Sequence, residues 1–168
     1  KLSSELLQNP VRVGVERKAA PASGVNQTVY PVPEDLKAEL LLALLAEGNV
    51  KDVIVFTRTK HRANRVAEKL VKAGISAERI HGNRSQSART EALAGFKSGK
   101  YRVLVATDIA ARGIDIDSLG HVVNFDVPNV PDDYIHRVGR TARAGQSGEA
   151  ITFCSPGEEP DLKAIEKA

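Results

Sequence analysis

Residues 53–60 read Val-Ile-Val-Phe-Thr-Arg-Thr-Lys, a short apolar run that leads directly into hydroxyl and cationic side chains. The run is rich in β-branched residues and lacks glycine and proline, which is typical of a strand buried on both faces. The next segment, residues 60–72, has an amphipathic pattern and predicts a helix that ends before Gly74. A strand followed at once by a helix is the repeating unit of a parallel α/β sheet.

The same unit recurs along the chain. Apolar runs predict further strands at residues 77–80, 102–106, 121–125 and 149–154. Helical patterns occur at residues 85–97, 131–137 and 158–168, and an edge strand (26–32) and a leucine-rich helix (34–47) precede the first unit. We therefore predict an α/β fold, a three-layer α/β/α domain with a mainly parallel sheet, over residues 25–168. Residues 1–24 include an Ala/Pro/Ser/Gly tract and predict the end of a preceding domain and an interdomain linker.

Composition narrows the class of protein. With 168 residues, 42% hydrophobic and 27% charged, the chain is typical of one globular domain. Cys154 is the only cysteine, which excludes disulfides and cysteine-based zinc clusters, and its strand-like surroundings predict a buried core residue. The chain has no apolar run of membrane-spanning length and no signal peptide, so we expect a cytoplasmic protein that does not contact a membrane. It begins with Lys1 and contains no methionine, so we expect a piece of a longer protein.

Positive charge is concentrated in the middle of the chain. Residues 51–102 hold thirteen Lys/Arg and four Asp/Glu, a local excess of nine positive charges, whereas the whole chain has a net charge of +3. Two interpretations stay open. The basic middle indicates either contact with a polyanion or a set of solvated lysine-rich helix faces.

Hydroxyl, glycine and cationic side chains follow three of the predicted strands directly. Thr59 follows the first, Gly82 and Arg84 the second, and Thr107 the third. Ligands collect beyond the carboxyl ends of parallel strands, and such groups are common contacts to a sugar-phosphate backbone, although ordinary helix capping also uses them. The few aromatic residues, such as Phe56, lie in strand runs, so we expect backbone recognition without base stacking.

Regularly spaced arginines follow the predicted strand at residues 121–125. Residues 134–145 read Tyr-Ile-His-Arg-Val-Gly-Arg-Thr-Ala-Arg-Ala-Gly and place Arg137, Arg140 and Arg143 at intervals of three, on one side of a helical or turn-like backbone. Guanidinium groups match phosphate oxygens. The sequence lacks a Gly-x-x-x-x-Gly-Lys-Ser/Thr loop, so these arginines are predicted to serve a phosphate held elsewhere. His136 is ambiguous between a structural residue and a base.

Asp115, after Arg112-Gly113-Ile114, has three readings: a salt bridge to Arg112, a turn residue, or a carboxylate for a ribose hydroxyl. No cluster of His, Asp and Glu in the sequence resembles a metal site.

Four of these segments, in this order, resemble motifs IV, IVa, V and VI of the C-terminal RecA-like domain of DEAD-box ATP-dependent RNA helicases. They are residues 54–60, 81–89, 106–115 and 136–143. The resemblance covers residues 25–168 and implies a RecA-like fold. Asn83 stands where many members have Asp, and Ala142 where many have Gly. Asn83 and residues 57–61 are similar to the RhlE-type bacterial subgroup.

The resemblance implies a role for each matching position. Arg137 and Arg140 would be arginine fingers that reach the γ-phosphate of ATP, and Asp115, with Gly113, would contact the nucleotide at its ribose. The implied RNA-phosphate contacts are Thr59, Gly82, Arg84 and Thr107. The implied supporting or interdomain residues are Phe56, which would pack beneath the finger arginines, Gln86, Arg89, Arg112 and His136.

The resemblance also implies the activity. Such a protein couples ATP hydrolysis to local duplex unwinding, with ATP and Mg²⁺ held mainly by an N-terminal RecA-like domain whose phosphate-binding loop and Asp-Glu-Ala-Asp box are absent from this sequence. The chain alone is therefore expected to be inactive. Its implied partners are RNA, that domain, and ribosomal or RNA-decay assemblies. Two alternatives stay open: a non-enzymatic RNA-binding scaffold, and a translocating DNA helicase or nuclease domain.

Overall fold

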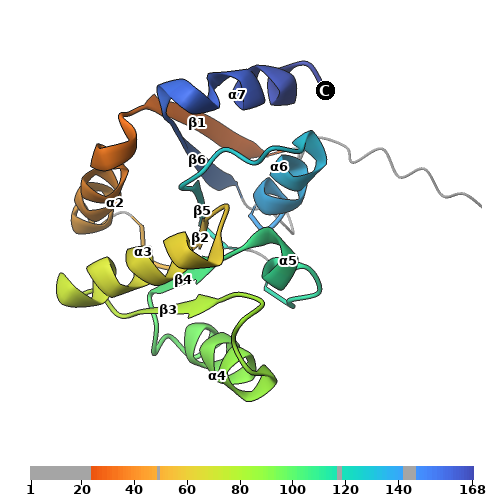
Figure 1. The fold of residues 1–168 in the computed structure, drawn as a ribbon. Coiled ribbons are helices and arrows are strands. Elements are labelled where there is room, and N and C mark those ends of the chain that lie inside the picture. The colour runs from red at the N-terminus through yellow and green to blue at the C-terminus, as the bar shows by residue number, and fades with distance from the viewer. Residues whose placement is uncertain (1–23, 49, 117–118, 142–146) are drawn as a thin grey trace, which may run out of the picture.

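The computed structural model of the chain describes residues 24–48, 50–116, 119–141 and 147–168. Its centre is a six-stranded sheet with the strand order β1-β6-β5-β2-β4-β3, in which every neighbouring pair is parallel (Figure 1). The strands are β1 (Val25–Pro31), β2 (Val53–Phe56), β3 (Ala77–Ile80), β4 (Val103–Ala106), β5 (His121–Asn124) and β6 (Gly148–Cys154).

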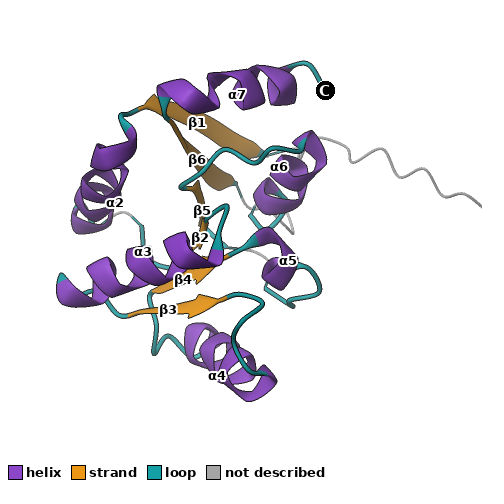
Figure 2. Cartoon of the chain, in the orientation of Figure 1, coloured by secondary structure: helices purple, strands orange, loops and turns teal. Residues whose placement is uncertain are grey.

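Helices cover both faces of this sheet (Figure 2). They are α2 (Lys37–Ala46), α3 (Lys60–Lys72), α4 (Gln86–Lys97), α5 (Asp108–Ala111), α6 (Pro131–Val138) and α7 (Glu159–Glu166), with the 3₁₀ turns η1 (Glu34–Leu36) and η2 (Pro156–Glu158). The predicted α/β/α architecture is confirmed, and the predicted elements agree with the observed ones to within about a turn at their ends. The short helix α5 has no counterpart in the prediction.

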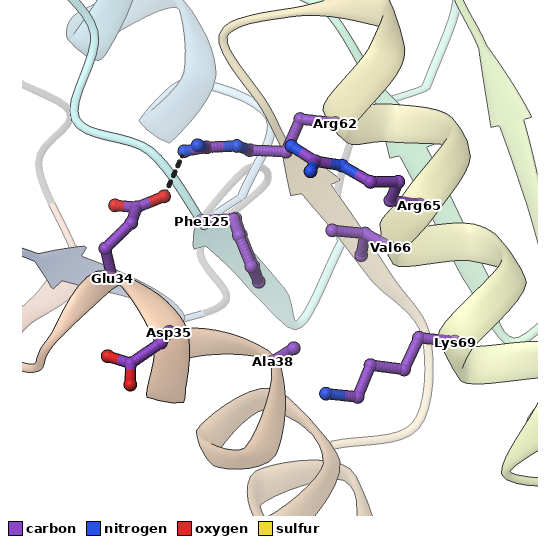
Figure 3. Close-up of a pocket in the computed structure, with 8 residues that line it drawn as sticks. All are labelled: Glu34, Asp35, Ala38, Arg62, Arg65, Val66, Lys69 and Phe125. Atoms are coloured by element: carbon purple, nitrogen blue, oxygen red, sulfur yellow. Dashed lines mark ion pairs between the residues drawn. The ribbon is translucent and has the colours of Figure 1, made fainter.

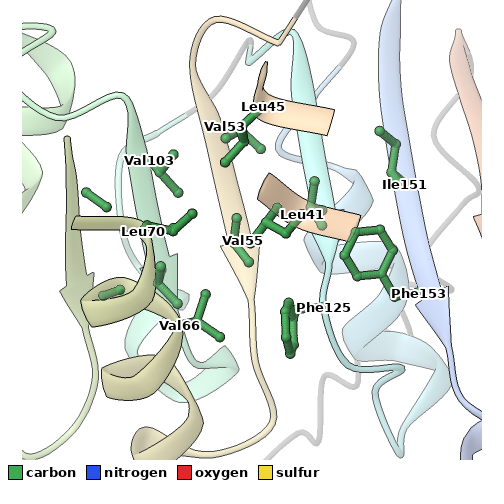
Figure 4. Close-up of a cluster of buried hydrophobic side chains, with 14 of the residues drawn as sticks. Leu41, Leu45, Val53, Val55, Val66, Leu70, Val103, Phe125, Ile151 and Phe153 are labelled. Carbon is green, nitrogen blue, oxygen red and sulfur yellow. The ribbon is translucent and has the colours of Figure 1, made fainter. Parts of the chain in front are cut away.

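Side chains of the central strands alternate between two hydrophobic cores. Val53 and Val55 of β2 pack with Leu41 and Leu70 of α2 and α3 on one face (Figure 4). Ile54 and its neighbours on the other face pack under α4 and α5. Because successive strand residues point to opposite faces, a strand covered on both sides must be apolar throughout. This explains the uninterrupted apolar runs in the sequence.

Helix starts and stops follow local side-chain chemistry. Thr59 and Ser85 cap α3 and α4, their hydroxyl oxygens accepting the backbone N–H of Arg62 at 3.2 Å and of Ala88 at 3.3 Å. Gly74 ends the turn after α3 with a φ of +81°, in the left-handed region that favours glycine. The caps place the N-termini of both helices at the carboxyl edge of the sheet.

Other expectations meet mixed outcomes. Cys154 is buried, as predicted, and burial raises the pKa of its thiol. Leu36 lies within the predicted leucine-rich helix (34–47) but is 49% exposed, because it belongs to η1, before α2 begins. Nearly all of the predicted domain end and linker (residues 1–24) lies outside the described residues. No described helix is both long and apolar enough to cross a membrane.

Candidate functional site

The residues that follow β2, β3 and β4 meet at one edge of the sheet. These strands are adjacent and parallel, so their carboxyl ends lie together. The Thr107 N–H donates to the Ile80 carbonyl at 3.3 Å, which fixes the start of α5 beside the end of β3. Thr59 and Gly82 are exposed, whereas Thr107 is buried except for 9% of its surface. The predicted grouping of these positions is therefore confirmed.

Arg137, one of the arginines predicted to serve a phosphate held elsewhere, does not point into solvent. Only 1% of the residue is exposed, and its guanidinium lies 5.2 Å from the centre of the Phe56 ring. Its Nε and Nη2 donate to the two carboxylate oxygens of Asp108 at 2.6 and 2.8 Å. Its Nη1 donates to the Asp126 carbonyl at 2.6 Å and to Asn124 Oδ1 at 3.3 Å. A guanidinium saturated in this way braces the protein and does not offer a fork to a nucleotide.

The physical reason for the difference is the end of α6. The helix stops at Val138 and Gly139 follows as its cap, so the interval of three that places residues on one helix side does not extend to Arg140. Arg137 is part of the helix and faces the sheet, whereas Arg140 lies beyond the end of the helix. Arg143, the third of the spaced arginines, lies outside the described residues.

Arg140 is half-buried and holds the loop after α5. Its Nη1 donates to the Ile114 carbonyl at 2.8 Å and its Nη2 to the Ala111 carbonyl at 3.3 Å. Gly113, inside this loop, has a φ of +77°, which a side chain disfavours. Arg140 therefore fixes the backbone that carries both Gly113 and Asp115.

A small cleft brings together arginines from the loop after α5 and from the end of α6. Its walls are Phe56, Asp108, Ala111, Arg112, Asp133, His136, Arg137 and Arg140. Arg112 reaches across it to Asp133, with Nη2 and Oδ1 2.6 Å apart. His136 is exposed at its margin. The predicted supporting residues Phe56, Arg112 and His136 thus lie beside Arg140.

Asp115 does not line that cleft. It lines a hollow with Lys97 and with Asp52 and Leu119, which precede β2 and β5. Its side chain is 90% exposed, and the Lys97 ammonium donates to it at 2.9 Å. This hydrogen bond and charge lower the pKa of the Asp115 carboxyl. The alternative of a salt bridge to Arg112 is wrong, because Arg112 pairs with Asp133. The exposed carboxylate keeps acceptor positions for a hydroxyl ligand.

The loop after β3 carries two further predicted residues. Arg84 lies 3.5 Å from the Glu78 carboxylate. Arg89 donates weakly to Gln86 Oε1 and to the Ala110 carbonyl, both at 3.4 Å, so it ties α4 to α5. Gln86 is exposed at the start of α4.

Sequence reasoning missed two residues that organise this edge. His81 is 4% exposed and its Nε2 shares a hydrogen bond with Asn64 at 2.9 Å, and burial together with the charges of Arg79 and Arg84 lowers its pKa. Asp108 directly follows Thr107, and no local signal in the sequence connects it with Arg137, because the two residues are 29 positions apart.

A separate charged group lies beyond β5 and β6. The carboxylates of Glu34, Asp126 and Glu158 approach one another closely enough to hold a cation. Lys37, which is fully buried, fills that position, with its ammonium 2.5 Å from Glu158, 3.2 Å from Glu34 and 3.6 Å from Asp126. This group therefore does not fit Mg²⁺. Figure 3 shows the adjoining pocket between η1–α2 and α3, where Arg62 pairs with Glu34, and none of the predicted site residues lines it.

Comparison with known proteins identifies the class. Residues 36–145 match the family described as "Helicase conserved C-terminal domain", and the chain belongs to it. It is the C-terminal RecA-like domain of a DEAD-box RNA helicase, which confirms the resemblance that the motifs indicate.

Two curated relatives are similar over almost the whole chain. The DEAD-box ATP-dependent RNA helicase CshA of Bacillus licheniformis is 44% identical over 99% of this chain and 34% of its own length. The ATP-dependent RNA helicase RhlB of Pseudomonas syringae pv. tomato is 41% identical over 99% of this chain and 42% of its own. The chain thus spans about a third to two fifths of these relatives. The RhlE-type assignment stays a prediction.

Solved structures agree with this family. A DEAD box protein from Methanococcus jannaschii has a TM-score of 0.81 and 38% identity, covering 86% of this chain and 40% of that one. The Escherichia coli DEAD-box protein SrmB, bound to regulator of ribonuclease activity A, has a TM-score of 0.77 and 39% identity, covering 84% of this chain and 83% of that one.

Proposed function

We propose that this chain is the C-terminal half of an ATP-dependent RNA helicase and supplies an arginine finger to ATP bound on a separate N-terminal RecA-like domain. The observation that carries the proposal is the placement of Arg140. It lines a cleft with Arg112 and His136 and is fastened to the loop of Gly113 and Asp115. The sequence has no phosphate-binding loop, so the phosphate must come from another domain.

Residues around Arg140 divide the work at the nucleotide. Arg140 supplies the charge that stabilises the transferring γ-phosphate, and the exposed Asp115 carboxylate accepts from the ribose, with Gly113 allowing close approach. Arg137 keeps its internal partners and acts as a brace. Mg²⁺, when bound with ATP, neutralises phosphate charge, and we assign its ligands to the other domain because Lys37 fills the one three-carboxylate group among the described residues.

The RNA half of the site is the row of Thr59, Gly82, Arg84 and Thr107. These residues contribute two hydroxyls, backbone N–H groups and a guanidinium, which contact phosphates without reading bases. RNA and ATP would each bind across the cleft between the domains, so each favours closure and thereby the other's binding. Closure would disrupt a short duplex locally, and hydrolysis would reopen the cleft.

The test is Arg140→Ala in the full-length protein. We expect the RNA-stimulated ATPase rate to fall by ~10³–10⁵, the typical contribution of such a finger, while RNA affinity changes less than about threefold. Arg65→Ala, at an exposed position of α3 that lies outside the row, is the matched control and should keep full activity. Full turnover by the Arg140→Ala protein would remove the finger assignment, and ATPase activity of the isolated chain would overturn the division of the site.

RNA binding by the full-length protein distinguishes the proposed function from the non-enzymatic alternative, an RNA-binding scaffold. A scaffold that binds RNA by its arginines should hold RNA tightly without ATP and with a steep salt dependence. A half-site should bind weakly until the other domain and ATP are present. Discrimination against DNA duplexes, through the 2′-hydroxyl, would exclude a DNA helicase or nuclease domain.

By the same likeness we propose a protein partner from an RNA-decay or ribosomal assembly. The SrmB structure, bound to regulator of ribonuclease activity A, supports this class of partner. Co-purification of the full-length protein from its source cells, with and without ribonuclease treatment, would show whether a protein contact exists.

A further inference from the structure

Unpartnered buried nitrogens gather in one short segment. Among the described residues, four buried side-chain nitrogens have no hydrogen-bond partner, and all lie between residues 79 and 89: Arg79 Nε, His81 Nδ1, Arg84 Nε and Arg89 Nε. A buried donor left without an acceptor destabilises the folded state, so native proteins rarely contain several together. Three guanidinium groups in this segment are therefore held short of satisfaction, next to the proposed RNA row.

One carboxylate contacts two of these guanidinium groups. Glu78 Oε1 lies 3.5 Å from Arg84 Nη2 and 3.7 Å from Arg79 Nη1. The same oxygen accepts the Arg79 backbone N–H at 2.8 Å, which holds it beside the backbone of β3. Residues 79–89 themselves contain no acid. Glu78 is thus the counter-charge of this basic segment.

The position of Glu78 determines where the Arg84 side chain lies. Arg84 follows the carboxyl end of β3, but its Nη2 reaches back to an oxygen that sits level with Arg79, one residue before the strand ends. Gly82 and Thr107 lie beyond that end, at the edge itself. The guanidinium is therefore turned away from the row in which it would meet RNA phosphates.

We propose that Glu78 is a positioning residue that holds Arg84 back from the RNA groove and so sets the affinity of the free domain for RNA. The proposal rests on the proposed function, which assigns RNA phosphate to Arg84. RNA must break the pair before Arg84 can contact a phosphate. Glu78 and Arg84 side chains are 21% and 27% exposed, so the pair is weak enough to exchange for a phosphate contact.

The test compares two charge-matched variants of this chain, Glu78→Gln and Glu91→Gln. Glutamine at position 78 keeps an oxygen for the Arg79 N–H and removes only the charge. Glu91, on α4, has a 72% exposed side chain and faces Lys100, so its replacement changes the net charge equally at a different place. Binding is measured by fluorescence anisotropy with a labelled ten-nucleotide oligouridylate at low salt.

We expect Glu78→Gln to bind the oligonucleotide about two- to fivefold more tightly than Glu91→Gln, the exchange of an ion pair worth up to about 1 kcal/mol. The gain should vanish when Arg84→Gln is added. Nitrogen-15 relaxation of the Arg84 Nε–H should show faster motion in Glu78→Gln, and thermal melts should show that each variant is folded.

Each other outcome has a consequence. Equal affinities of the two single variants, or a gain that survives Arg84→Gln, would overturn the role of Glu78 and leave the proposed function intact. If the isolated chain binds too weakly to measure, the same variants are compared in the full-length protein with ATP. Failure of every variant and of the wild-type protein to bind RNA there would overturn the assignment of the row to RNA, and the role of Glu78 with it.

Discussion

Replacement of Arg137 by alanine tests whether this arginine is a brace or a finger. The substitution removes a bidentate contact to Asp108, two hydrogen bonds to Asn124 and the Asp126 carbonyl, and the stacking on Phe56. Breaking a buried ion pair on one side typically costs about 3–5 kcal/mol. The Asp108 side chain is 22% exposed, so water solvates it partly in the variant. We therefore expect a loss near the lower end, about 3 kcal/mol.

The assay is urea unfolding of the chain, followed by circular dichroism in the helical region. Domains of this kind have unfolding free energies of about 5–15 kcal/mol, so the variant should still fold. The slope of free energy against urea should stay unchanged, because the surface exposed on unfolding is the same. Arg137→Lys keeps the charge but not the planar fork, so we expect it to lose about half as much.

Arg65→Ala serves as the control, since Arg65 is exposed on α3 and should change stability by less than about 0.5 kcal/mol. If Arg137→Ala unfolds within that margin of the wild-type chain, with an unchanged slope, the guanidinium is not held as described. The interpretation of Arg137 as a finger would then return.

Two further substitutions test the packing away from the arginines. Burial alone would raise the pKa of Glu158, but hydrogen bonds from Lys37 and from Ser155, just before η2, outweigh burial and hold the pKa below its ordinary value. The Glu158 carboxylate therefore stabilises the fold above its unfolded-state pKa of about 4.3, and this contribution is lost as pH falls through the lower folded-state value. Between pH 7 and pH 3, the urea midpoint of unfolding should fall more steeply for the wild-type chain than for Glu158→Gln. Parallel curves for the two proteins would contradict this. Gly95→Ala places a Cβ 2.4 Å from the Tyr101 ring and should cost about 1–3 kcal/mol in urea unfolding, whereas Gly157→Ala, with open space around it, should cost less than about 0.5 kcal/mol; equal losses would show that the ring moves aside freely.

The order of strands and helices could be predicted because each element carries its own local signal. The central strands are apolar at every position, α3 has a clear amphipathic period, and Thr59 and Ser85 mark helix starts by their hydroxyls. Helix α5 was not predicted because four residues are too few to show a helical period of hydrophobic residues. What the local signals do not contain is the strand order, in which β1 and β6 form one edge region although they are far apart in sequence.

The site was predictable where it depends on strand ends and not where it depends on side-chain direction. Parallel strands place Thr59, Gly82 and Thr107 at one edge regardless of details. The fate of Arg137 depended on where α6 ends, and a buried Lys37 contradicts the usual exposure of lysine. To predict the position of Arg137 and the burial of Lys37, one would have to know which acidic residues the tertiary fold brings near them.

The buried ion pair of Asp108 and Arg137 constrains how the two halves of the site can communicate. Asp108 follows Thr107 of the proposed RNA row, and Arg137 precedes Arg140 by one turn of chain. Four hydrogen bonds fix the guanidinium between them, so the RNA row and the nucleotide cleft belong to one rigid unit. An internal shift of one against the other would have to break this pair, whose guanidinium is almost fully buried. We infer that RNA and ATP are coupled by movement of this unit as a whole against the other domain, and that Arg84, whose ion pair with Glu78 is long and partly exposed, is the group that rearranges within it.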